Sequence, residues 1–280
     1  MRRLITIAMA CTLAFTAQAQ IALRNMELGL NSGGMNYIGD LNNQSMLSTV
    51  HWAAGTFFRI NWNDRWALTI GASMGQVEGG NPDCMAWRNL SFQSPITEAY
   101  LRAEFNFWPF GLGGMQFKWT PFVFGGIGAF HFNPKAQLEN PATQKMEWHE
   151  LQPLHTEGQG MEQYPTHKPY DLLQMSMPFG LGVKWMPAKT LTVAAEYGFR
   201  KSWTDYLDDV STTYVDNDLL RQRYGDVAAD LADRSATRNN AGIKRGDDSL
   251  DDWYAYFHVS ISVSFDLLFG WMKKKNCDIK

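Results

Sequence analysis

The chain has 280 residues, of which 45% are hydrophobic and 14% aromatic, and its formal net charge is -3. This near balance of charge argues against nucleic acid as a partner, because a phosphate-binding surface needs a clear basic excess. The mean hydropathy of -0.30 argues against a bundle of membrane helices, and the many aromatic residues argue against disorder. A soluble globular protein and a membrane β-barrel remain, because a barrel carries its apolar residues at alternate positions.

The first segment has the features of a secretory signal peptide. Arg2 and Arg3 precede a short apolar stretch, and residues 17–19 (Ala-Gln-Ala) fit the small-residue rule for cleavage. We therefore expect residues 1–19 to be removed and the mature chain to be exported.

The clearest strand pattern lies near the C-terminus. From Trp253 to Leu267, fifteen residues, every odd position is apolar. Such a strand would be roughly 50 Å long at ~3.3 Å per residue, whereas strands of globular proteins average about five or six residues. A tilted strand that crosses a bilayer accounts for this length.

Seven further segments alternate in the same way. They are residues 26–37, 52–62, 66–75, 97–107, 122–132, 175–185 and 191–200. Eight is an even number and the smallest common size of a transmembrane barrel. The sequence therefore predicts an all-β fold, in which residues 20–269 form an eight-stranded antiparallel transmembrane β-barrel with long extracellular loops.

The connections between these strands alternate between short and long. Short turns are predicted near Asn63 and at residues 187–190, with a longer Gly-rich turn at residues 108–118. The predicted long connections are residues 38–49, 77–95, 133–174 and 201–252. Because outer-membrane barrels place short turns in the periplasm and long loops outside, we expect these four to be extracellular, and residues 270–280 to form a periplasmic tail.

Charged residues of both signs occupy the strand face opposite the apolar one. We expect them to pair inside the barrel, because an unpaired buried charge is very costly. The predicted lumen network is Arg59, Glu98, Arg102, Glu104, Lys184, Glu196, Arg200 and Asp266. Side chains fill the interior of a barrel of eight strands, so we predict a plugged barrel and no open channel.

A soluble β-sandwich or a lipocalin-like barrel is the alternative, with apolar residues inside and polar residues outside. Alternation alone does not say which face is inside. The strand length, the loop asymmetry and the aromatic residues at strand ends, which are typical of interfacial girdles, favour the membrane form. We therefore predict a location in the outer membrane of a Gram-negative bacterium, in contact with its lipid.

Histidines and aspartates in the long loops are candidate metal ligands. His131, His149, His155 and His167 are irregularly spaced, whereas a metal site needs three or four converging ligands. The last loop is rich in aspartate but lacks the D-x-D-x-D-G spacing of a calcium loop. We interpret it as an acidic, solvated loop and predict no metal site; its aspartates are Asp205, Asp208, Asp209, Asp216 and Asp218.

Three further features receive structural interpretations. His258 and Ser260 share one strand face, but no third orienting group or G-x-S-x-G elbow is evident, so we predict no catalytic residues, no cofactor and no enzymatic activity. Cys84 and Cys277 are predicted on opposite sides of the membrane and should not pair. The tripeptide at residues 245–247 (Arg-Gly-Asp) is short enough to occur by chance.

A series of short sequence words runs along nearly the whole mature chain. They include residues 37–41 (YIGDL), 120–128 (TPFVFGGIG), 130–136 (FHFNPKA), 156–160 (TEGQG), 204–209 (TDYLDD), 211–216 (STTYVD), 231–235 (LADRS), 245–247 (RGD) and 252–254 (DWY). Together they resemble the PorG-like family, the small outer-membrane β-barrel component of the type IX secretion system. The charge-rich stretch at residues 238–251 departs from the family pattern apart from its tripeptide.

The resemblance implies a non-enzymatic role in protein secretion and, in some bacteria, gliding motility. The implied partners are a periplasmic ring lipoprotein (PorK-like) and its partner (PorN-like). An eight-stranded barrel is too narrow to pass a folded protein, so the role that remains is to anchor or assemble the ring. Only the periplasmic end can reach it, and the candidate contacts are Lys118, Lys273, Lys274 and Lys275.

Two other functions stay open from the sequence. The outer loops could bind a host matrix or carbohydrate, as in an adhesin or receptor barrel. A small barrel enzyme that modifies lipid is the third hypothesis, and it would depend on His258 or Ser260.

Overall fold

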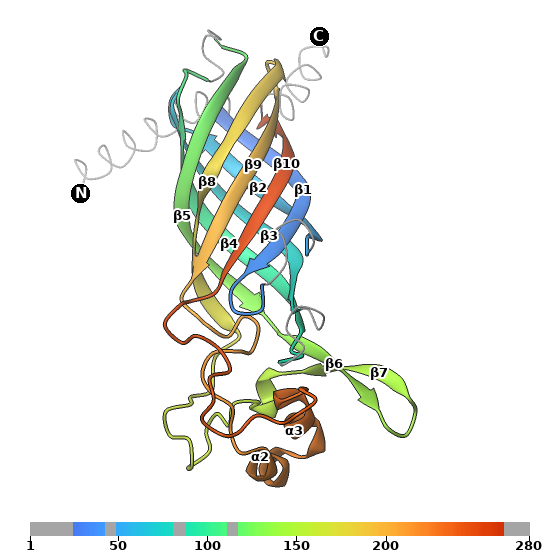
Figure 1. The fold of residues 1–280 in the computed structure, drawn as a ribbon. Helices are drawn as coiled ribbons and strands as arrows, with labels where there is room; N and C mark the ends of the chain where they lie inside the picture. Colours follow the sequence, from blue (N-terminus) through green and yellow to red (C-terminus); the bar gives the residue numbers. More distant parts are fainter. Residues whose placement is uncertain (1–24, 43–48, 81–87, 111–116, 266–280) are drawn as a thin grey trace, which may run out of the picture.

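The computed structural model describes residues 25–42, 49–80, 88–110 and 117–265, and its main part is a closed antiparallel barrel (Figure 1). The sheet has ten strands, of which two leave the barrel, so that eight form the ring. These eight are β1 (Met26–Ile38), β2 (His51–Asn61), β3 (Trp66–Gly79), β4 (Phe92–Asn106), β5 (Trp119–Phe132), β8 (Leu173–Ala188), β9 (Leu191–Ser202) and β10 (Trp253–Ser264). Pairing of β1 with β10 closes the ring.

All eight predicted barrel strands are confirmed, but the predicted bounds of one loop are wrong. Residues 77–95 were expected to be a loop, yet Val77 pairs with Ser94 and Gly79 with Phe92. The two strands continue because Val77 and Phe92 point inward and are buried, with exposed fractions of 0% and 2%. The connection is thus shorter than expected.

The last strand is also shorter than predicted. It ends at Ser264, and the backbone is no longer extended at Phe265. The ring of Phe265 instead packs edge-on against Phe58 of β2, with ring centroids 5.5 Å apart. The uninterrupted strand predicted as far as Leu267 is therefore wrong at this point.

The barrel strands are apolar on the outside and polar on the inside. In β4 the inward residues are buried in strict alternation with exposed outward ones. Exposed apolar side chains on the outer surface include Leu30, Ile70, Leu101, Ile127, Leu181, Val259 and Ile261. This arrangement is the reverse of a lipocalin and is the pattern of a barrel whose solvent is lipid.

The long connections fold into a cap at one end of the barrel (Figure 1). We define the cap as residues 133–172 and 203–252. It contains β6 (Lys135–Asn140), β7 (Lys145–Glu150), the 3-10 helix η2 (Gln152–Leu154), α2 (Asn217–Tyr224) and α3 (Asp226–Ala232). The fold is therefore nearly all-β, and the predicted loops carry structure of their own.

Local sequence explains the first of the two cap helices. The side chain of Asp216 accepts hydrogen bonds from the backbone N–H groups of Asp218 and Leu219, which is an N-cap. Gly225 follows the helix with a φ of 91°, a conformation that favours glycine. Leu220 is the buried residue of the helix and packs in a small apolar cluster with Met161.

A single apolar core joins the barrel mouth to the cap. Its buried members from the barrel include Tyr37, Phe130, Phe132 and Tyr254, and those from the cap include Leu151, Tyr170, Leu207 and Val210. Because both parts contribute side chains, the cap is packed against the barrel.

Several predictions fall outside the described residues. They are the signal peptide at residues 1–19, the periplasmic tail at residues 270–280, the two cysteines Cys84 and Cys277, and Asp266. Among the helices that the structure describes, none is both long and apolar enough to cross a membrane.

Candidate functional site

A network of ion pairs fills the middle of the barrel. Arg59 lies between two carboxylates, with Nη1 3.0 Å from Glu27 Oε2 and Nε 3.0 Å from Glu104 Oε2. Arg102 bridges the next two, at 2.9 Å from Glu104 Oε1 and 2.7 Å from Glu196 Oε2. Arg59 of β2 therefore links β1 and β4, and Arg102 links β4 to β9.

Two further cations complete the network. Lys184 Nζ lies 2.6 Å from Glu104 Oε2 and 3.0 Å from Asn106 Oδ1. Arg200 Nε lies 3.3 Å from Glu98 Oε2. Glu104 thus contacts three cations, which makes it the centre of the network.

The structure places seven of the eight predicted lumen residues in this interior, with exposed fractions between 0% and 4%. They are Arg59, Glu98, Arg102, Glu104, Lys184, Glu196 and Arg200. The eighth, Asp266, lies outside the described residues. Sequence reasoning missed Glu27 and the contact of His258 with Glu196, at 3.4 Å. Glu27 was detectable, because it alternates with the outward residues Leu28 and Leu30.

The lumen is closed at the level of this network. Arg59, Arg102 and Arg200 are each only 1% exposed, so water does not reach their side chains. Aromatic rings occupy the remaining space. The ring centroid of Phe124 is 4.2 Å from the Arg102 guanidinium carbon, and that of Phe122 is 4.4 Å from Lys184 Nζ. These are cation–π distances, and the interior is packed as the sequence predicts for eight strands.

His258 and Ser260 lie inside this closed lumen. Their exposed fractions are 4% and 2%. The rings of His258 and Tyr256 lie at a tilt to each other, with centroids 4.4 Å apart. The pair considered for lipid hydrolysis therefore faces the buried network and does not face the outer, apolar surface of the barrel.

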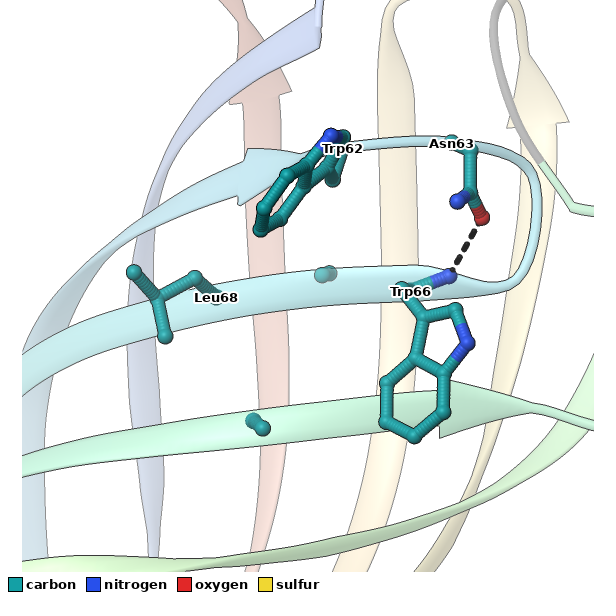
Figure 2. Close-up of a pocket in the computed structure, with 6 residues that line it drawn as sticks. Trp62, Asn63, Trp66 and Leu68 are labelled. Carbon is teal, nitrogen blue, oxygen red and sulfur yellow. Dashed lines mark hydrogen bonds between the residues drawn. The ribbon is translucent and has the colours of Figure 1, made fainter.

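Aromatic side chains surround the short-turn end. Trp62 and Trp66 are 84% and 49% exposed, and they border a groove of about 370 Å³ on the outer surface with Leu68 and Ala103. Figure 2 shows the Asn63 side chain turned toward the backbone of Trp66, whose N–H it accepts at 2.9 Å. This bond fixes the tight turn that presents the two indole rings.

A second aromatic group lies on the longer turn at the same end. Trp108 packs edge-on against Trp119 at 4.2 Å and is stacked with Phe117 at 5.9 Å. Lys118 lies between the latter two and is exposed, while its carbonyl accepts a hydrogen bond from the N–H of Met186 at 2.7 Å. Of the four predicted lysine contacts, Lys118 is described; Lys273, Lys274 and Lys275 lie outside the described residues.

A buried glutamate organises the cap. Glu157 is 0% exposed and accepts hydrogen bonds from the backbone N–H groups of Ser211 and Thr212 at 2.9 and 3.0 Å. Arg245 Nη1 lies 2.9 Å from its Oε1. This ion pair connects residues 88 positions apart in sequence and therefore joins the third and last connections.

The interpretation of the last loop as solvated is wrong for three of its aspartates. Both carboxyl oxygens of Asp205 are buried. Asp208 and Asp209 are 1% and 0% exposed. Asp209 accepts hydrogen bonds from Thr156 at 2.5 Å and Tyr170 at 2.7 Å. Burial raises the pKa of Asp209 to about 6, although Arg245 opposes this shift. Hydrophobic neighbours in the cap bury these carboxyls, a feature that composition does not reveal.

The other loop candidates lie apart from one another. Asp216 and Asp218 are exposed at the start of α2. His149 is on β7, His155 packs against Tyr224 with ring centroids 4.7 Å apart, and His167 Nδ1 is 2.6 Å from the Glu157 carbonyl oxygen. Within the described ranges, no group of three His, Cys, Asp or Glu side chains is arranged to hold a metal ion. Arg245 of the Arg-Gly-Asp tripeptide is buried against Glu157.

The closed ring of eight strands, the apolar outer surface and the charged interior define a small β-barrel of the outer-membrane type. Residues 2–154 match the family described as Domain of unknown function (DUF6089), and the chain belongs to that family. Among curated proteins, none matches the sequence.

Solved structures of bacterial barrels are similar to this one at low sequence identity. Neisserial surface protein A has a TM-score of 0.42 at 6% identity, with 86% of this chain and 97% of that chain covered. Ail, the attachment invasion locus protein of Yersinia pestis, has a TM-score of 0.38 at 8% identity, covering 85% and 96%. The outer membrane protein OprG from Pseudomonas aeruginosa has a TM-score of 0.37 at 11% identity, covering 85% and 96%.

Proposed function

We propose that this chain is a non-enzymatic barrel of the outer membrane that anchors or assembles the periplasmic ring of a type IX protein secretion system. The observation that carries the proposal is the closed lumen, in which the central arginines are 1% exposed. A barrel filled by its own ion pairs offers no path to a polypeptide. Its two ends are therefore the surfaces through which it would contact partner proteins.

Several of the sequence words that carry the PorG-like resemblance meet in the buried cap network. Residues 156–160 supply Glu157, residues 211–216 supply the backbone donors to it, and residues 245–247 supply Arg245. Residues 231–235 supply Ala232, whose carbonyl accepts from Arg245 Nε at 3.2 Å. In this chain these words therefore contribute contacts to the same cap network.

The short-turn end is the surface proposed for the ring. It presents Lys118 between Phe117 and Trp119, both about half exposed at 42% and 48%. Aromatic side chains flanking a cation suit a partner that lies at the membrane surface, because aromatic rings favour the interface. The proposed partner residues on the ring lipoprotein are acidic.

The test is affinity purification of the tagged, full-length chain from native outer membranes in mild detergent. We expect the ring lipoprotein (PorK-like) and its partner (PorN-like) to co-purify. The contact variant is Lys118→Glu combined with Lys273→Glu, Lys274→Glu and Lys275→Glu, which should reduce recovery of the ring. The matched control is Lys189→Glu, because Lys189 is exposed in another turn at the same end.

The outcomes separate the function from the contact. If no ring protein is recovered with the unaltered chain, the proposed function is wrong. If the ring is recovered equally with the contact variant and the control, the function stands and the lysine contact is wrong. Loss of cell or matrix binding on removal of the cap, with secretion intact, would instead support the adhesin alternative.

A further inference from the structure

One tyrosine hydroxyl lies between two buried carboxyl groups where the cap meets the barrel. The Tyr37 hydroxyl oxygen is 2.7 Å from Asp208 Oδ2 and 2.7 Å from Asp252 Oδ1. Exposed fractions are 0% for Tyr37, 1% for Asp208 and 0% for Asp252. We call these three residues the tyrosine–aspartate cluster.

The two short contacts require a shared proton. A phenol hydroxyl carries one hydrogen and can donate to one carboxylate only. The other carboxyl must therefore carry a proton itself, so that it donates to the phenol oxygen. The second oxygen of each carboxyl group already has a hydrogen-bond donor. Asp208 Oδ1 accepts from the N–H of Val210 at 2.9 Å, and Asp252 Oδ2 accepts from the N–H of Leu207 at 3.0 Å.

The surroundings of the cluster are mostly acidic. Carboxyl groups face it from the first connection and the last connection, and the facing cation is Arg245. The carboxyl groups are Asp40 and Asp205, with Arg88 and Lys244 beside Asp40. The Tyr170 hydroxyl, from the third connection, also faces Asp208. Arg245 is already engaged by Glu157 at 2.9 Å. Burial raises the pKa of Asp208 to about 8 and, with repulsion from Asp208, raises that of Asp252 well above its usual range.

The cluster also fastens the chain mechanically. Asp252 begins the return into β10, and its N–H donates to the Thr204 carbonyl at 3.0 Å. Leu207 and Val210, whose N–H groups bind the two carboxyls, are 0% and 1% exposed in the core shared with the barrel. A change in the charge of the two carboxyl groups therefore affects the segment whose side chains, Leu207 and Val210, pack the cap against the barrel.

We propose that Tyr37, Asp208 and Asp252 form a proton-binding site that fastens the cap over the barrel mouth, and that release of its proton to water loosens the cap. In the protonated state Tyr37 donates to one carboxylate and the other carboxylic acid donates to Tyr37. After release, two buried carboxylates compete for one hydroxyl hydrogen, and hydration of the opened segment relieves their repulsion. No covalent bond changes.

The pH range follows from the sign of the pKa shift. The closed cap binds one proton more than the opened cap between the ordinary aspartate pKa of about 4 and the raised value of about 8. For each such proton, the ratio of closed to open cap falls roughly tenfold for every pH unit by which the pH rises across that range. Below it the cap is fully stabilised, and above it the stabilisation is lost.

The test is hydrogen–deuterium exchange of the full-length barrel in detergent from pH 5 to pH 8.5, corrected for intrinsic exchange rates. The peptide to follow spans residues 203–212, with β4 peptides as the reference for an intact barrel. Asp208→Asn imitates the protonated acid, because its amide can donate to Tyr37 while its oxygen still accepts from Val210. Asp252→Asn is the second variant, and Asp248→Asn, in an exposed part of the same loop, is the control.

We expect the logarithm of protection in residues 203–212 to fall with pH in the unaltered chain and in Asp248→Asn. In Asp208→Asn and in Asp252→Asn the slope should be shallower by about one unit, which corresponds to one proton. At pH 8 either variant should protect the cap better than the unaltered chain does. An unaltered slope in a variant whose β4 peptides remain protected would overturn the proposal.

Discussion

In the lumen, each buried glutamate among the described residues lies beside an arginine or lysine, whereas Asp208 and Asp252 at the barrel mouth lie beside a tyrosine. Both regions remove carboxyl groups from water. The lumen compensates their charge with cations, and the mouth compensates it with a proton. Between pH 5 and pH 8.5 the attachment of the cap should therefore depend on pH more strongly than the barrel wall does.

The largest expected effect comes from breaking the lumen network. Arg59→Leu would leave Glu27 and Glu104 without their shared guanidinium contacts, and removal of one member of a buried pair costs about 3–5 kcal/mol. We expect a loss of that size in the free energy of unfolding, measured by urea titration of the barrel in detergent with tryptophan fluorescence. Lys189→Leu, at an exposed position, is the control. A change below about 1 kcal/mol, the range of an exposed ion pair, would show that the lumen pairs are not coupled to barrel stability.

A change in the cap network should affect the cap and spare the barrel. Glu157→Gln removes the charge that faces Arg245 and weakens the acceptor of Ser211 and Thr212. We expect a cost of about 2–3 kcal/mol, as for loss of hydrogen bonds to a buried charge, and this cost should appear as faster proteolysis of the cap. Equal destabilisation of the barrel strands would indicate that the two regions unfold as one unit.

Substitution of Asp205 is expected to have a smaller effect on the stability of the cap, and this effect should be a gain. Burial raises the pKa of Asp205 to about 8, so its neutral form stabilises the closed cap at low pH, and this contribution is lost as pH rises through about 8. Although both carboxyl oxygens of Asp205 are buried, the residue as a whole is partly exposed. Asp205→Asn should therefore stabilise the cap by about 1 kcal/mol at pH 8 and have no effect near pH 4. Thermal unfolding of the cap followed at both pH values measures the difference. Destabilisation at pH 8 would contradict it.

The barrel is the part that the sequence predicts well, because its signal is local. Alternation of side chains across each strand follows from the geometry of extended backbone, so it identified eight strands and the inward positions of residues such as Arg59 and Glu196. The first strand was the weakest prediction, because Gly33 and Gly34 interrupt its pattern. Glu27 lies before this interruption and alternates with Leu28 and Leu30, so the same pattern could have placed it in the lumen.

The cap was beyond prediction because its contacts join distant segments. Tyr37 and Asp252 are 215 positions apart, and no periodicity connects them. The aspartates of the last loop look solvated by composition, yet Asp209 is bound by Thr156 and Tyr170 from another connection and Asp208 by Tyr37 of β1. The Asp216 and Gly225 signals could have located the first cap helix, since they are an N-cap residue and a helix-ending glycine.

The lumen of the barrel is closed, and we therefore propose that the barrel acts through its ends. The most direct measurement is the ionic current across a planar lipid bilayer that contains the purified full-length chain, with correct insertion verified by protease protection of the barrel. We expect no sustained current steps at neutral pH, because ion pairs and aromatic rings fill the lumen. Reproducible, discrete current steps from the unaltered chain would contradict this expectation.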